Sequence, residues 1–206
     1  MRIGIDIDDT TVVAVKSMIK YGDIYDINDL GKNGINGNFG LIQNGKYLQA
    51  LYGWNNEEKN AFFAKYYKNI LEECEPMENA PEMVAKLKEE GNEIFFITAR
   101  YSNIKNCNTE EITIKTLKEN NIPYDKLIVN ASDKLKFCKE HNIEIFIEDG
   151  YATCKQLEEN GIKSYLMTTR MNAQIDSGEI ERVTTWEELY NKIHNFIEEK
   201  RQISKK

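Results

Sequence analysis

The sequence predicts an α/β fold in which a doubly wound parallel sheet carries a small helical cap, inserted after the first strand. Short runs of consecutive apolar residues recur along the chain, and segments with helical end signals separate them. Near-continuous apolar strands are typical of a parallel sheet that helices cover on both faces. Residues 11–79 separate the first run from the second, which is far more chain than one crossover needs and indicates an insertion.

The apolar runs are the expected strands of the sheet, and polar residues follow or end each one. They are IGID (3–6), EIFFITAR (93–100), KLIVNAS (126–132), EIFIEDG (144–150) and KSYLMTT (163–169). In an open α/β sheet, ligands bind outside the carboxyl ends of the strands. The polar residues at those ends are therefore the candidate site.

Helices are expected between the strands because their end signals are present. Pro81 stands at the start of one helix and Gly91 just past its end. Ser132 or Asp133 can cap the helix that follows the third strand. The residues TWEE (185–188) form a capping box that opens the last helix.

The inserted segment is interpreted as a mostly helical cap over the carboxyl ends of the strands. Its expected helices are TVVAVKSMIKYG (11–22), KYLQALYGW (46–54) and NEEKNAFFAKYYKNILEEC (56–74), and its loop is GKNGINGNFG (31–40). Asn55 and Glu58 are spaced as a helix cap. The domain prediction is therefore a core of residues 1–10 and 80–206 with a cap of residues 11–79.

Composition limits the classes of function. The chain has 206 residues and a net charge of −7, which disfavours nucleic-acid binding because that needs a basic face. Its four cysteines include no CxxC pair, so a zinc site or a disulfide framework is not expected. The sequence has no apolar stretch long enough for a secretion signal or a membrane span, and we expect a cytoplasmic protein with no membrane partner.

Acidic residues follow the first strand in the stretch DIDDT. Asp6 and Asp8 lie two residues apart, so both carboxylates can emerge at one end of the strand. Like charges this close repel one another unless a cation or a reaction accounts for them. One carboxylate can attack phosphorus while the other protonates the leaving oxygen, which is a covalent strategy for phosphoester hydrolysis.

The ends of the other strands supply matching groups. The hydroxyl of Thr98 and the backbone N–H groups beside it, such as that of Ala99, can donate hydrogen bonds to phosphoryl oxygens. Lys134 offers a positive charge after the third strand, and Lys136 is its rival two residues on. Asp149 arrives from the fourth strand, where Mg²⁺ would neutralise the cluster with oxygen ligands.

In these stretches the sequence resembles the haloacid dehalogenase superfamily of phosphohydrolases. DIDDT, ITAR, Lys134 and IED look like the four motifs of that superfamily. The second aspartate of the DxDxT form marks its phosphatase and phosphotransferase branch. Within the superfamily the chain is most similar to the 5'(3')-deoxyribonucleotidase group and its bacterial relatives, in the Asp9 variant of the first motif, the compact cap and the paired acids.

The resemblance implies a role for each matching residue. Asp6 would be the nucleophile and Asp8 the acid/base, and the side chain of Asp6, the backbone carbonyl of Asp8 and Asp149 would hold Mg²⁺. Thr98 and Lys134 would bind the phosphoryl group.

Two positions depart from the common family pattern. Asp9 stands where glycine is commonest, so a different turn is expected there. Glu148 stands where aspartate is frequent, and we expect it to hold a metal-bound water or to orient Lys134.

Substrate specificity is expected in the cap, because the cap closes over the strand ends. The cap is rich in aromatic residues, which can stack on a nucleobase but which also suit the cap's own core, as Phe62, Phe63, Tyr66 and Tyr67 do. The candidate substrate residues are Asp9, Lys32 in the Gly/Asn-rich loop, and Arg100, which could instead pair with an acid such as Glu148.

The predicted function is a Mg²⁺-dependent phosphomonoesterase whose partner is a small molecule, a 5'- or 3'-(deoxy)nucleoside monophosphate. One alternative is a phosphatase of a sugar phosphate or another small metabolite. A second alternative is a catalytically silent protein that binds a phosphate ligand or a partner. The sequence leaves a homodimer open.

Overall fold

The structure, a computed structural model, describes residues 1–37 and 47–203. Its centre is a six-stranded sheet in the order β5-β4-β1-β6-β7-β8, and all neighbouring strands are parallel. The strands are β1 (Arg2–Ile5), β4 (Glu93–Ile97), β5 (Lys126–Ile128), β6 (Ile145–Glu148), β7 (Lys163–Met167) and β8 (Glu181–Val183). The predicted α/β fold class is confirmed, whereas the short edge strand β8 was not foreseen.

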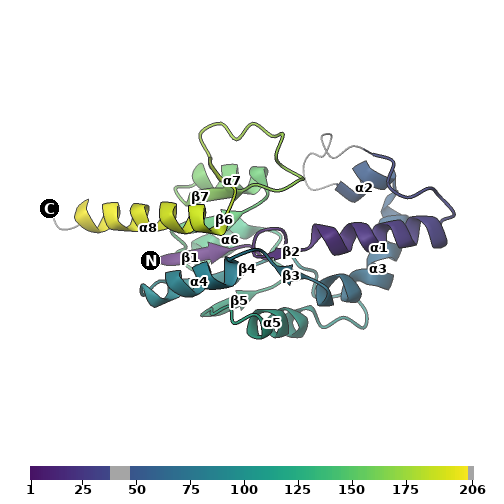
Figure 1. The fold of residues 1–206 in the computed structure, drawn as a ribbon, viewed down its shortest axis with the longest axis horizontal. Coiled ribbons are helices and arrows are strands. Elements are labelled where there is room, and N and C mark those ends of the chain that lie inside the picture. Colours follow the sequence, from purple (N-terminus) through teal and green to yellow (C-terminus); the bar gives the residue numbers. More distant parts are fainter. Residues whose placement is uncertain (38–46, 204–206) are drawn as a thin grey trace.

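Helices cover both faces of this sheet (Figure 1). They are α4 (Ala80–Glu89), α5 (Thr109–Glu119), α6 (Lys134–Glu140), α7 (Tyr151–Glu158) and α8 (Trp186–Ile203). Side chains alternate between the two faces along β4. Ile94 and Phe96 join the core formed with α4, α5 and α8, while Phe95 and Ile97 join the core formed with α6 and α7. Burial on both faces explains why the strands read as continuous apolar runs.

The central strand β1 lies against β6 because Gly4 has no side chain. A Cβ atom at Gly4 would lie 2.4 Å from Cδ2 of the buried Phe146, so any side chain there would force the ring or the strand to shift. The parallel pairing continues beyond the strand, since the backbone N–H of Asp6 donates to the carbonyl of Ile147 at 2.9 Å. These contacts fix Asp6 at the carboxyl end of the sheet.

Several predicted helix ends are present. Pro81 lies in the first turn of α4, and Gly91 follows that helix with a φ of 86°, which favours glycine. Asp133 caps α6 by accepting from the backbone N–H of Lys136 at 3.1 Å. Thr185 accepts from the backbone N–H of Glu188, although the Glu188 carboxylate returns to Thr184 and not to the capping residue itself.

The insertion forms the helices α1 (Val15–Asn28), α2 (Tyr47–Tyr52) and α3 (Asn56–Glu72). Asn55 and Glu58 make the expected capping box of α3. These helices share a core of buried aromatic and aliphatic side chains, among them Tyr25, Trp54 and Phe62. Figure 1 shows the three helices gathered at the end of the molecule opposite the two termini.

A two-stranded antiparallel ribbon joins the insertion to the core. β2 (Val12–Val13) pairs with β3 (Glu75–Pro76). The expectation of a helix from residue 11 is therefore wrong at its start, because two valines, which favour strands, pair across the ribbon before the helix begins at Val15. The last part of the predicted 31–40 loop lies outside the described residues. None of the helices in the described part of the chain has the length and apolarity to cross a membrane.

Candidate functional site

A cavity of about 1080 Å³ lies where the carboxyl ends of the strands face the cap. Every one of the four motifs contributes to its wall, and so do the cap helices and the loop after β7. The residues that line it include Asp6, Asp8, Asp9, Asn56, Lys59, Phe63, Tyr67, Thr98, Ala99, Arg100, Tyr101, Lys134, Glu148, Asp149, Asn172 and Asp176.

Asp6 lies directly after β1 and is 5% exposed. Its Oδ1 atom is 2.7 Å from the ammonium nitrogen of Lys134. The pKa of Asp6 is raised to about 7, chiefly because burial disfavours its charge; Lys134 opposes this rise, and the charges of Glu148 and Asp8 add to it. The carboxylate therefore depends on nearby positive charge to stay ionised.

Lys134 provides that charge from the first residue of α6. Its ammonium nitrogen is also 2.6 Å from Oε2 of Glu148, so it bridges two carboxylates. The two acids raise the pKa of this lysine against the effect of its burial, which keeps it protonated. Lys136, the rival from the sequence, is exposed and pairs with Glu140 at 3.9 Å. The structure thus brings Lys134 and not Lys136 to Asp6.

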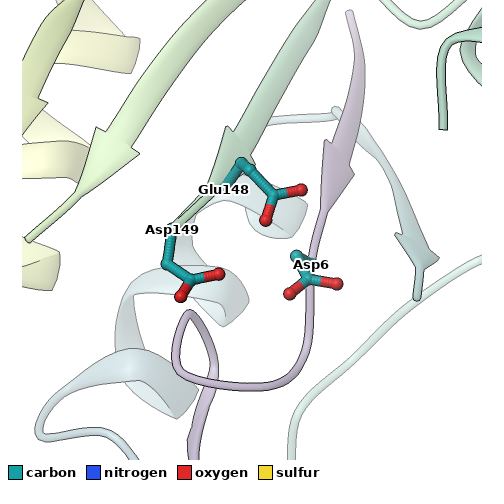
Figure 2. Close-up of side chains that lie close together, drawn as sticks. All are labelled: Asp6, Glu148 and Asp149. Atoms are coloured by element: carbon teal, nitrogen blue, oxygen red, sulfur yellow. The ribbon is translucent and has the colours of Figure 1, made fainter. Parts of the chain in front are cut away.

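Asp6, Glu148 and Asp149 form a group of carboxylates that could hold a metal ion. One oxygen from each lies within 4.8 Å of the others, and Figure 2 shows the three carboxylates gathered at the ends of β1 and β6. Burial and the neighbouring acids raise the pKa of Asp149 well above its usual range. When all three are ionised, the carboxylates and the one ammonium carry a charge of −2, which a divalent cation would balance, and oxygen donors suit a hard cation.

Asp8 forms an ion pair with Arg100. Nε of Arg100 lies 2.9 Å from Oδ2 of Asp8 and its NH2 nitrogen lies 2.7 Å from Oδ1, which is a two-point contact. The Arg100 side chain has no exposed surface, whereas a third of the Asp8 side chain is exposed. Glu148, the acid suggested from the sequence as its partner, pairs with Lys134 and not with Arg100.

Thr98 and Ala99 lie at the end of β4. Thr98 is buried, and its Oγ1 accepts from the backbone N–H of Arg100 at 3.2 Å. Ala99 is exposed on the cavity wall. Backbone hydrogen bonds from Asn130 and Ala131 to this loop connect it to the segment that leads to Lys134.

Asp9 closes the turn after the first motif. Its φ of 57° is left-handed, and its carboxylate accepts from the backbone N–H groups of Ala14 and Val15, both at 2.9 Å. The left-handed region is the one that glycine favours, so the different turn expected at this position is not shown and stays a prediction. These contacts give Asp9 a role in ending the turn and starting α1, beside its position on the cavity wall.

Lys32 is not brought to the site. Its ammonium pairs with Glu58 near the start of α3 at 2.7 Å, and it is absent from the residues that line the cavity.

A row of residues on α3 faces the cavity. Sequence reasoning did not single out Asn56 and Lys59, and it left open whether Phe63 and Tyr67 would stack on a base or form the cap core. Asn56, Lys59, Phe63 and Tyr67 recur at spacings of three and four, which places them on one side of a helix. Phe63 and Tyr67 pack around Tyr101, with ring centroids 5.9 Å from it in both cases. Phe62 and Tyr66 belong to the cap core as expected. Phe63 and Tyr67 pack together in a neighbouring cluster with Leu71 and Cys107, and both form part of the cavity wall.

Asn172 is a second residue that sequence reasoning missed. Its buried side-chain amide donates to the backbone carbonyls of Asp149 and Met167, both at 2.7 Å, and its oxygen accepts from Arg182 at 2.8 Å. This amide connects the loop after β7 to the end of β6 and so supports Asp149. A single asparagine in a turn-rich stretch gives no signal of that role in the sequence.

Comparisons with known proteins point to one group. No family model matches the sequence. A nucleotidase of Clostridium acetobutylicum is 28% identical over 158 residues, which cover 76% of this chain and 79% of that protein. The candidate nucleotidase YqfW of Bacillus subtilis is 26% identical over 202 residues, which cover 95% of this chain and 94% of that protein.

Solved structures agree in fold at low sequence identity. A predicted phosphatase from Clostridium acetobutylicum aligns with a TM-score of 0.68 and 13% identity over 94% of this chain and 98% of that one. A haloacid dehalogenase-like hydrolase from Streptococcus pneumoniae aligns with a TM-score of 0.67 and 12% identity over 93% and 97%. The fold is that of the haloacid dehalogenase superfamily. The resemblance drawn from the four haloacid dehalogenase-like motifs, and from their likeness to bacterial nucleotidases, is confirmed.

Proposed function

We propose that the protein is a phosphomonoesterase that works through an aspartyl-phosphate on Asp6 and hydrolyses nucleoside monophosphates. The observation that carries this proposal is the meeting of Asp6, Lys134, Glu148 and Asp149 at the carboxyl ends of β1 and β6, with Asp8 two residues from the nucleophile. A buried carboxylate between a fixed cation and a metal-ligating group is suited to attack phosphorus. The names of the similar proteins, nucleotidase and phosphatase, support the same chemistry.

In the proposed reaction the Asp6 carboxylate attacks phosphorus and the ester oxygen departs with a proton from Asp8. Asp8 then takes a proton from a water molecule, which attacks the aspartyl-phosphate and releases inorganic phosphate and free Asp6. Lys134, the Thr98 hydroxyl and the backbone N–H of Ala99 are the groups that would bind the phosphoryl oxygens. Their fixed positions would stabilise the charge of the transition state without reorganisation.

A divalent cation, Mg²⁺ in our proposal, would be held by Asp6 and Asp149, with Glu148 beside them and already engaged by Lys134. When bound, it would balance the carboxylate charge and polarise the phosphoryl group. The feature that fits a divalent cation is the net charge of −2 on the three carboxylates and the Lys134 ammonium.

The cavity supports a substrate that extends from the strand ends to the cap. Lys59 lies eight residues before Tyr67 on α3, about 12 Å along the helix axis. A bare phosphate would not span that distance, whereas a nucleoside monophosphate would place its base between the Phe63 side of the wall and the Lys59 ammonium. Stacking on aromatic rings and donation to a base carbonyl are ordinary means of holding a base.

The test is inorganic phosphate release from a panel of nucleoside monophosphates, sugar phosphates and p-nitrophenyl phosphate, with Mg²⁺ and with chelator. Turnover of nucleotides that requires Mg²⁺ and disappears in Asp6→Asn is the expected result. Turnover confined to sugar phosphates would retain the chemistry and overturn the nucleotide assignment. Retained turnover in Asp6→Asn would overturn the aspartyl-phosphate.

A further inference from the structure

Arg100 holds the carboxylate of Asp8 with a rigid two-point contact. Two of its nitrogens face the two carboxylate oxygens at 2.9 and 2.7 Å, and the planar guanidinium fixes the direction of both bonds. Arg100 lies in the wall of the cavity, but its side chain has no exposed surface and its guanidinium is engaged by the carboxylate of Asp8. The contact through which this arginine can act on the site is therefore the one with Asp8.

The other side of the guanidinium is fixed as well. Its NH1 nitrogen donates to the Thr113 hydroxyl at 2.9 Å, and that hydroxyl donates to the carbonyl of Thr109 at 2.7 Å. Thr113 lies on α5, is fully buried and is not itself one of the residues that line the cavity. The position of Arg100 is thus determined by a helix of the core and not by a ligand.

The cap is connected to the same chain of hydrogen bonds. The Thr109 hydroxyl donates to the carbonyl of Tyr101, and the N–H of Tyr101 donates to the phenol oxygen of Tyr67 on α3 at 2.9 Å. Tyr101 directly follows Arg100 in the chain. The cap helix and the arginine are therefore joined through one residue of backbone.

We propose that Arg100 is the positioning residue of Asp8, and that Thr113 positions Arg100 in turn. This inference rests on the proposed function, in which one carboxylate has to meet the leaving oxygen first and a water molecule afterwards. A third of the Asp8 side chain is exposed to the cavity. Without the two-point contact to Arg100, the carboxylate would be free to turn away from the leaving oxygen and from the water molecule. A misplacement of about 1 Å is enough to cost roughly 10²-fold in rate.

The test compares kcat/KM for a nucleoside monophosphate and for p-nitrophenyl phosphate, whose leaving group departs without a proton. Arg100→Gln should lower kcat/KM about 10²-fold for the nucleotide and much less for p-nitrophenyl phosphate, as Asp8→Asn should. In the Asp8→Asn background, Arg100→Gln should cause no further loss, because it has no carboxylate left to position.

Thr113→Val is the second variant, because it removes the hydroxyl without leaving a cavity-facing change. Like Arg100→Gln, it should lower kcat/KM more for the nucleotide than for p-nitrophenyl phosphate, but by a smaller factor. Thr113→Ser, which keeps the hydroxyl, should resemble the wild type. Thr116→Val is the matched control, since the Thr116 hydroxyl bonds only to the carbonyl of Ile112 on its own helix. It should leave both substrates unaffected.

Equal losses for the two substrates, or a further loss in the double variant, would overturn the positioning role. A rise in KM alone for Arg100→Gln would show a substrate contact and would overturn it too. A wild-type protein that turns over neither substrate would overturn the proposed function and this inference with it. A wild type that turns over both, with unaffected Arg100 and Thr113 variants, would overturn this inference alone.

Discussion

The ammonium of Lys134 lies 2.7 Å from Oδ1 of Asp6, and both side chains are almost entirely buried. The lysine belongs to the first turn of α6 and the aspartate follows β1, so the contact joins two distant parts of the chain. Glu148 completes the arrangement at 2.6 Å on the other side of the ammonium. One cation therefore compensates two buried carboxylates, and the stability and the chemistry of the site both depend on it.

Replacement of Lys134 should affect folding and activity together. Lys134→Met leaves the carboxylates of Asp6 and Glu148 buried without their cation, and loss of one partner of a buried pair costs about 3–5 kcal/mol. Phosphate release should fall at least about 10²-fold, because a charge that stabilises the transition state is lost. Lys136→Met is the control, because that lysine is exposed and should change the unfolding free energy by less than about 0.5 kcal/mol. Equal denaturation curves and rates for the two variants would contradict the assignment.

Mg²⁺ should raise the melting temperature, because a ligand that binds only the folded state stabilises it. The carboxylate group predicts that Asp149→Asn abolishes most of this shift. Asp176→Asn is the matched control, since Asp176 lines the cavity without belonging to the three-carboxylate group. Differential scanning fluorimetry against a Mg²⁺ series would measure both. An undiminished shift in Asp149→Asn would place the ion elsewhere.

The sequence predicted the core well because local signals and burial agree there. The strands β1, β4 and β6 are apolar on both faces. Asp6 and Asp149 follow β1 and β6, Lys134 opens α6 after β5, and the structure brings these motif residues together. A continuous apolar run bounded by polar residues is readily assigned as a buried parallel strand. The order of strands and helices then places the residues that follow the strands at the same edge of the sheet.

Contacts between distant side chains could not be predicted in the same way. Nothing local distinguishes Glu148 from Asp8 as the partner of Arg100, because the choice depends on which strand ends lie adjacent. The helical spacing of Phe63 and Tyr67 suits a cap core and a cavity wall equally well. Which of the two they form depends on how α3 packs beside α5. Strand β8 is three residues long, too short for a periodic signal.

Lys59 should contribute to substrate affinity more than to rate. It lines the cavity, and within the described part of the chain its ammonium makes no ion pair, so it is available to an acceptor on the substrate. Lys59→Met should raise KM for nucleoside monophosphates about tenfold, as expected for one charge-assisted hydrogen bond, and leave kcat nearly unchanged. Hydrolysis of p-nitrophenyl phosphate should not change. Lys68→Met, on the exposed side of the same helix, should behave as the wild type. A fall in kcat alone would contradict this.

Asp9 should make stability depend on pH in the acidic range. Burial raises the pKa of its carboxyl to about 6, against about 3.9 in an unfolded chain. The folded state therefore binds more protons between these values, and this group's contribution to stability falls as pH rises from about 4 to about 6. Asp9→Asn keeps an acceptor for the N–H groups of Ala14 and Val15 but does not titrate. In chelator, its melting temperature relative to the wild type should increase across that pH range. A difference that stays constant with pH would be the contrary result.

Gly4 should be intolerant of even one added carbon. A Cβ there would lie 2.4 Å from the ring of Phe146 and 3.1 Å from Cγ2 of Ile143, and Phe146 is fully buried, so a shift of the ring would disturb the packing around it. Gly4→Ala should cost about 1–3 kcal/mol in chemical denaturation, as overpacking of a core does. The Phe146 ring also lies 5.7 Å from the Lys134 ammonium, so activity should fall with stability. Because the smaller leucine leaves space for the added methyl group, Phe146→Leu should be less harmful in the Gly4→Ala protein than in the wild type. Additive effects of the two changes would show that the close approach of β1 and β6 does not determine the choice of glycine.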